Sequence, residues 1–126
     1  MSLKLNYQNL VEQLKRRVPK FVVYYEEEED SLNAFVFFVH FLRDSFNDQE
    51  VIKPAADFIS EMAEIDDVDV KVVLEDLLLD LYSLFTEQNI PVEAITNKIS
   101  PKAKEVYDRV VMIWLRSGEQ TPIKKI

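Results

Sequence analysis

His40 is the only histidine in the chain, and Asp44 follows it by four residues. On a helix this spacing places the two side chains one turn apart, where the carboxylate could orient the imidazole as a general base. The nearest hydroxyl, that of Ser45, would lie on the same helix, and the chain has no cysteine to act as a nucleophile. A helical His–Asp pair is more often a surface electrostatic pair. We therefore expect that the protein is not an enzyme, with a catalytic centre at His40 as the weaker alternative.

Neither the acidic residues nor the single glycine forms a recognisable metal or cofactor motif. Asp66, Asp67 and Asp69 resemble the start of a calcium loop, but the central glycine and the closing glutamate of that loop are missing. These residues are therefore expected to cap a helix. Di-metal helical bundles use Glu-x-x-His pairs, and here Phe37 stands three residues before His40. A single glycine excludes phosphate-cradling loops. The sequence predicts neither a metal site nor a cofactor.

The strongest chemical feature is the negative charge in the middle of the chain. The net charge is −8, and residues 57–87 contain ten acidic residues but only one basic residue, Lys71. Such a patch repels nucleic acid and anionic membranes, and it attracts basic proteins. Seven of the acids are candidates for a partner-binding surface: Asp57, Glu61, Glu64, Asp69, Asp76, Asp80 and Glu87. The simpler alternative is that the acids only keep an apolar pair of helices in solution.

Several of these acids belong to a long apolar stretch, approximately residues 68–87, around which the rest of the chain must be organised. At about 100° per residue, its apolar side chains cover most of the helix surface and leave one narrow acidic stripe. A helix that is apolar almost all round is buried by other helices. The sequence therefore predicts an all-α, single-domain bundle of about five or six helices around a central hydrophobic helix.

Periodicity and capping signals place the other helices. Asn6 is expected to cap a first helix, which Pro19 ends. Asn89 is expected to end the central helix in the left-handed conformation, and Ser100 is expected to cap the last helix. Further helices are expected at residues 31–46, 48–63, 92–99 and 101–118.

One stretch has a second interpretation. Residues 21–25 and 35–39 both have the composition of β-strands, and a hairpin that joins them is the main rival to a helical fold. Residues 34–42 lack the strict alternation of a half-buried strand, which favours a helix there. Residues 20–28 fit a short helix or an irregular link, and the sequence leaves that choice open.

The composition bounds the class and the location of the protein. A length of 126 residues suits one domain, 1–126, and one glycine against 14 aromatic residues favours helices over a turn-rich β fold. The C-terminal residues 119–126 are expected to be frayed. The chain has no cysteine, no apolar run that could span a bilayer and no signal-peptide pattern at its start, so a cytoplasmic location is expected.

The order of these signals resembles that of small all-helical bacterial proteins of uncharacterised function, some of which are regarded as immunity proteins for secreted toxins. The segments that carry the resemblance are VPKF (18–21), AFVFFVHFL (34–42), DFISEMAEIDD (57–67) and VVLEDLLLDL (72–81). They share a hydrophobic pattern and contain no diagnostic motif, so no functional residue is carried over. The resemblance implies a monomeric or dimeric helical binding protein.

These observations lead to the hypothesis of a non-enzymatic protein-binding domain, of immunity or regulatory type, whose acidic surface binds a basic protein. The alternative is a structural homodimer, of unknown role, in which exposed aromatic residues such as Tyr24, Tyr25 or Trp114 form the interface. The third hypothesis is an enzyme centred on His40, which requires a cleft around that residue.

Overall fold

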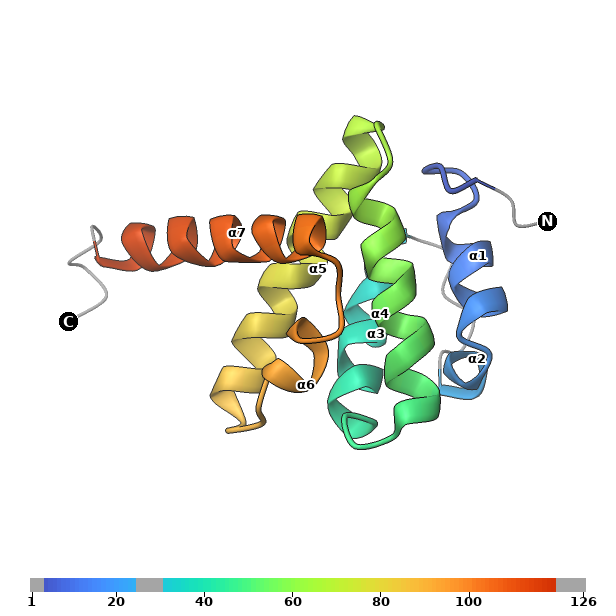
Figure 1. Ribbon diagram of the computed structural model, residues 1–126, viewed down its shortest axis with the longest axis horizontal. Helices are drawn as coiled ribbons and strands as arrows, with labels where there is room; N and C mark the ends of the chain where they lie inside the picture. The colour runs from blue at the N-terminus through green and yellow to red at the C-terminus, as the bar shows by residue number, and fades with distance from the viewer. Residues whose placement is uncertain (1–3, 25–30, 120–126) are drawn as a thin grey trace.

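The computed structural model describes residues 4–24 and 31–119, and the regular secondary structure within these ranges is entirely helical. The all-α class is therefore confirmed for the described residues. They form seven helices: α1 (Leu10–Arg17), α2 (Lys20–Tyr24), α3 (Ser31–Asp44), α4 (Gln49–Ala63), α5 (Val68–Glu87), α6 (Glu93–Thr96) and α7 (Pro101–Glu119) (Figure 1). This exceeds the five or six helices expected, because the residues after Pro19 form a short helix of their own.

The β-hairpin alternative does not occur in the described residues. Its first run lies in α2 up to Tyr24, and its second run lies within α3. An aromatic cluster joins these helices to α4, since the Phe21 ring lies 5.5 Å from the ring centroids of both Phe38 and Phe41. The rings of Phe35 and Phe58 stack at 6.2 Å. A helix places Phe35, Phe38 and Phe41 on one buried side, which a strand could not do at a spacing of three residues.

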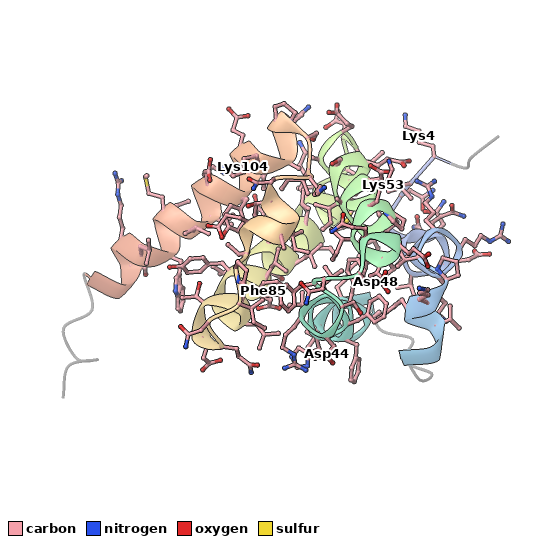
Figure 2. All side chains as sticks on the ribbon, turned by 60° about the horizontal axis from the view of Figure 1, so that its bottom comes forward. Lys4, Asp44, Asp48, Lys53, Phe85 and Lys104 are labelled. Atoms are coloured by element: carbon pink, nitrogen blue, oxygen red, sulfur yellow. The ribbon has the colours of Figure 1, made fainter. Side chains whose placement is uncertain are left out.

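α5 packs against α3, α4 and α7. It begins after Asp67, whose carboxylate accepts a hydrogen bond from the Asp69 backbone N–H at 2.9 Å. After the helix ends, Asn89 has φ of 58°, which confirms the predicted left-handed residue. Phe85 lies between the helices, whereas Lys4 lies at the edge of the molecule (Figure 2). The buried residues of α5 are Val70, Val73, Leu74, Leu77, Leu78, Leu81 and Phe85.

The first helix begins later than the sequence suggests. Asn6 was the expected cap, but α1 starts at Leu10, with Asn9 at the N-cap position. The side chains of Asn6 and Asn9 each accept a hydrogen bond from the other's backbone N–H, at 3.0 and 2.9 Å. This reciprocal pair forms a turn before the helix, and it uses the acceptor oxygen that would otherwise cap α1.

The start of α7 is attached to α4 through two serines. The Ser100 hydroxyl accepts a hydrogen bond from the Ala103 N–H at 3.2 Å, which confirms the predicted cap. The Ser100 N–H donates to the Ser60 hydroxyl at 2.8 Å, and that hydroxyl donates to the Ala56 carbonyl at 2.8 Å. The beginning of α7 therefore has a fixed position on α4, because the cap residue is itself hydrogen-bonded to that helix.

Figure 1 shows that α7 runs across α5 and that its C-terminal half extends beyond the other helices. α1 lies on the opposite side of the molecule. None of the helices in the described ranges combines the length and the hydropathy that crossing a bilayer requires. Residues 119–126 were expected to be frayed; Glu119 is the last residue of α7, and residues 120–126 lie outside the described part of the chain.

The packing of α5 predicts an unequal response to two truncations on that helix. Leu81→Ala should lower the free energy of unfolding by about 2–5 kcal/mol, because a fully buried leucine leaves a cavity. Val68→Ala should change it by less than about 0.5 kcal/mol, because Val68 is 72% exposed. Denaturant unfolding followed by circular dichroism measures both. Equal losses in the two variants would contradict the packing described here.

Candidate functional site

Three of the seven predicted binding residues lie together where α5 meets α3. Asp76 and Asp80 are one turn apart on α5, and Glu87 follows toward its end; all three are exposed. No salt bridge joins any of the three to another residue in the described ranges. We call this group the α5 acidic surface. In this part of the predicted surface, neighbouring acidic residues form no salt bridge with a described basic residue.

Apolar hollows adjoin the α5 acidic surface along α3. One hollow of about 270 Å³ lies between Phe35 and Val36 of α3 and Asp76, Leu79 and Asp80 of α5. A second, of about 330 Å³, reaches from Val36 past Asp80 to Glu87. Val36 and Asp80 line both hollows, so the two are neighbours along the same seam. The carboxylates therefore lie beside apolar side chains that line the same hollows.

The environment of Asp80 disfavours its charge. Partial burial raises the pKa of the Asp80 carboxyl above its ordinary value of 3.8, and the negative charge of Asp76 raises it further. His40 acts in the opposite direction and lowers it. A positively charged group placed beside Asp80 and Asp76 would favour the ionised form of both carboxyls.

The acids of α4 have a different arrangement. Glu61 forms a salt bridge with Arg17 of α1, and Glu64 lies 3.8 Å from the ammonium of Lys102 on α7. Asp57 is exposed on the same helix, and no salt bridge joins it to another described residue. The seven predicted acids were expected to form one binding surface. Instead Glu61 and Glu64 pair with basic residues of the neighbouring helices.

Basic and acidic residues together line the hollow where α5 and α7 meet near the end of α4. Lys71, Lys102 and Arg109 line this hollow of about 170 Å³ with Glu75 and Glu105. The Arg109 guanidinium also bonds the Glu75 carboxylate at 2.9 Å. Asp69, the remaining predicted residue, is exposed in the first turn of α5. The acidic character of the surface is therefore concentrated on the α3 side of α5.

His40 faces α5 and not its predicted partner. Asp44 accepts a hydrogen bond from the Nε of Arg43 at 2.9 Å. His40 is partly exposed and lines the hollow that holds Asp80 and Ser83. No hydrogen bond links His40 to any residue in the described ranges, so a base that is held in place by a carboxylate is not formed there. Sequence reasoning missed the approach of His40 to Asp80, because nothing local relates two helices that are 40 residues apart.

The expected capping role of the aspartates before α5 is confirmed at Asp67. Across residues 4–24 and 31–119, no three His, Cys, Asp or Glu side chains gather in a way that could hold a metal ion. Asp66 instead lies 3.6 Å from the ammonium of Lys71. The described part of the chain thus presents carboxylates as separate charges and not as a chelating set.

Only one of the three aromatic side chains proposed for a homodimer interface lies within the described residues. Tyr25 and the side chain of Tyr24 lie outside the described residues. Trp114, the third of them, is 43% exposed. It lines a hollow of about 280 Å³ with Ile113 of α7 and with Asp76 and Leu79 of α5. Asp76 and Leu79 therefore face hollows on both sides, toward α3 and toward α7.

The chain was compared with protein-family models, with curated proteins and with solved structures, and none of them matches it. The resemblance to immunity-type helical proteins therefore stays a prediction. The candidate site rests on the geometry of the described residues.

The position of Asp76 beside Asp80 predicts that removing the charge of Asp76 changes the pKa of the Asp80 carboxyl. Asp76→Asn should lower the pKa of Asp80, because it removes one of the two causes that raise it. Carbon-detected NMR titration of the side-chain carboxyls measures the midpoint directly. Asp57→Asn, a control on α4, should leave the midpoint of Asp80 unchanged. An Asp80 midpoint that does not respond to Asp76→Asn would contradict the proximity of the two charges.

The same pKa shift predicts how stability depends on pH. A raised pKa means that folded Asp80 binds its proton more tightly than unfolded Asp80. Its contribution to the free energy of unfolding therefore falls as pH rises from 3.8 through the folded pKa. Asp80→Asn should gain stability relative to the wild type across that window, keep the gain at higher pH and show none below pH 3.8. Denaturant unfolding over a pH series measures the difference, and a gain confined to acid pH would reverse the expected sign.

Proposed function

We propose that the protein is a non-enzymatic protein-binding domain, of immunity or regulatory type, and that a basic protein partner binds along the α5 acidic surface. The observation that carries this proposal is the grouping of Asp76, Asp80 and Glu87 beside the apolar hollows of the α3–α5 seam. Protein interfaces combine an apolar centre with polar groups at the rim. This seam offers both within a short distance along one helix.

The dimensions of the seam favour a protein segment over a small molecule. The hollows of about 270 and 330 Å³ are at the lower end of the range for ligand-binding pockets. They adjoin each other, and the acids extend along α5 from Asp76 to Glu87, which spans about 16 Å at the rise of a helix. A long, shallow, partly apolar strip suits a helix or an extended loop of a partner.

The charges of the seam favour a basic partner. Asp80 is partly desolvated and lies near Asp76, so its ionised form is disfavoured in the isolated protein. A lysine or arginine from the partner would favour that ionised form, and the net charge of −8 would speed its approach. Asp57 and Asp69 would contribute to this long-range field. Glu61 and Glu64 would contribute less, because Arg17 and Lys102 already balance them.

The test is retention of a partner by matched surface variants. The wild-type protein and the triple variant Asp76→Asn, Asp80→Asn, Glu87→Gln are immobilised, and extracts of the organism of origin are passed over both. A basic protein should be retained by the wild type and bind the triple variant about tenfold more weakly, because each exposed pair contributes about 0.5 kcal/mol. The affinity should also fall between about 0.1 M and 1 M salt, as the screening length drops from about 10 Å to about 3 Å.

A second triple variant controls for net charge alone. Glu12→Gln, Glu50→Gln and Glu105→Gln remove the same number of exposed charges from α1, α4 and α7, and this variant should retain the partner as the wild type does. Equal retention by all three proteins, or an affinity that is flat with salt, would contradict binding through the α5 acidic surface.

A further inference from the structure

The imidazole of His40 shares a hollow with Asp80, although the two residues lie on different helices. His40 is partly exposed on α3, and Asp80 lines the same hollow from α5. The two helices pack against each other, so this pair of side chains belongs to opposite walls of the α3–α5 seam. The apolar walls of the hollow are Val36, Val39 and Leu84. His40 is therefore a titratable group within the proposed binding surface.

The charged groups that share the hollow with His40 are carboxylates. Every described residue that lines this hollow belongs to α3 or α5, and the charged ones from α5 are Asp80 and Glu87. α1 and α2 also contact α3, but none of their described residues lines it. On α3 itself, Asp44 accepts a hydrogen bond from its neighbour Arg43. A proton on His40 therefore brings a positive charge into a hollow to which the other described residues contribute negative ones.

This positive charge acts on the same carboxylates that a basic partner would use. Histidine is the side chain that changes its charge between about pH 5 and pH 8. A neutral His40 leaves Asp80 to a cation from outside, whereas a protonated His40 stabilises the ionised Asp80 and repels a lysine or arginine. The effect is also present in the isolated protein, where burial and Asp76 raise the pKa of the Asp80 carboxyl and His40 lowers it.

We infer that His40 makes the proposed binding surface sensitive to pH: a basic partner binds along the α3–α5 seam while His40 is neutral and is released as His40 gains a proton. This inference rests on the proposed function, because it concerns the same surface and the same class of partner. The imidazolium supplies to Asp80 the positive charge that a lysine or arginine of the partner would supply. Linkage requires the reverse effect as well, so a bound cation makes protonation of His40 less favourable.

The first measurement needs no partner. NMR follows the titration of the imidazole in the full-length chain without a histidine tag, in which His40 is the only histidine. Asp80→Asn should lower the titration midpoint of His40, because it removes a negative charge that favours the imidazolium. Glu105→Gln removes an exposed charge from α7 and should leave the midpoint unchanged. Equal midpoints in the wild type and in Asp80→Asn would overturn the inference.

The second measurement uses a synthetic basic peptide as the binding probe. A peptide of about 14 leucine and lysine residues forms an amphipathic helix about 21 Å long, which is long enough to follow α5 from Asp76 to Glu87. The wild type should bind it roughly three- to fivefold more weakly at about pH 6 than at about pH 8, the scale of one exposed charge pair. Isothermal titration calorimetry measures the affinity at each pH.

Two substitutions of His40 fix the charge of this position. His40→Gln is neutral and should bind the peptide with the higher affinity at both pH values. His40→Arg is cationic and should bind it with the lower affinity at both. Any pH effect of the carboxyls remains in both variants, so the difference from the wild type isolates the contribution of the imidazole. Circular dichroism at each pH checks that the variants are folded.

The outcomes distinguish this inference from the proposed function. If the triple variant Asp76→Asn, Asp80→Asn, Glu87→Gln binds the peptide more weakly but the wild type shows no pH dependence, the inference fails and the acidic surface stands. A pH dependence that is the same in His40→Gln as in the wild type would also overturn the inference. Equal binding by the wild type and the triple variant, or no binding at either pH, would contradict the proposed function and the inference with it.

Discussion

α5 has to bury seven apolar side chains while Asp69, Asp76 and Asp80 stay in water. An ionised carboxylate moved into the core without a partner would cost more than one buried apolar side chain contributes. The rotation of α5 about its own axis is therefore set by its carboxylates, and its packing partners α3, α4 and α7 must leave the acidic stripe uncovered. The seam on the α3 side and the recess on the α7 side both result from this constraint.

The position of α7 shows how one helix can be both core and surface. Its cap is hydrogen-bonded to α4 through Ser60, and Tyr107 packs edge-to-face on Tyr82 of α5 at a centroid distance of 6.4 Å. Burial of Tyr107 raises the pKa of its phenol to about 12, so this contact remains uncharged well above neutral pH. Residues 112–117 of the same helix are exposed, and its C-terminal half extends beyond the other helices (Figure 1). Its apolar sequence continues there, with Ile113 and Trp114 beside α5.

Local signals in the sequence predicted the helical class, the range of α5, the left-handed Asn89 and the Ser100 cap, because each of these depends on residues within one or two turns. The failures involve contacts between distant segments. The Asn6 N–H donates to the Asn9 side-chain oxygen that would otherwise cap α1, and Arg17 and Lys102 pair with acids that appeared free in the sequence. The exposure of residues 112–115 could not be predicted either, because the pattern of apolar residues does not contain the length over which a neighbouring helix is present.

Asp76 links the two sides of α5, because it lines the seam with α3 on one side and the recess with α7 on the other. Leu79 lines the same two hollows, so this part of α5 supplies both a charge and apolar surface to each side. A substitution at Asp76 therefore alters both hollows at once, whereas Asp80 and Glu87 line only the hollows on the α3 side. Binding through the α3–α5 seam is for that reason probed more specifically at Asp80 and Glu87 than at Asp76.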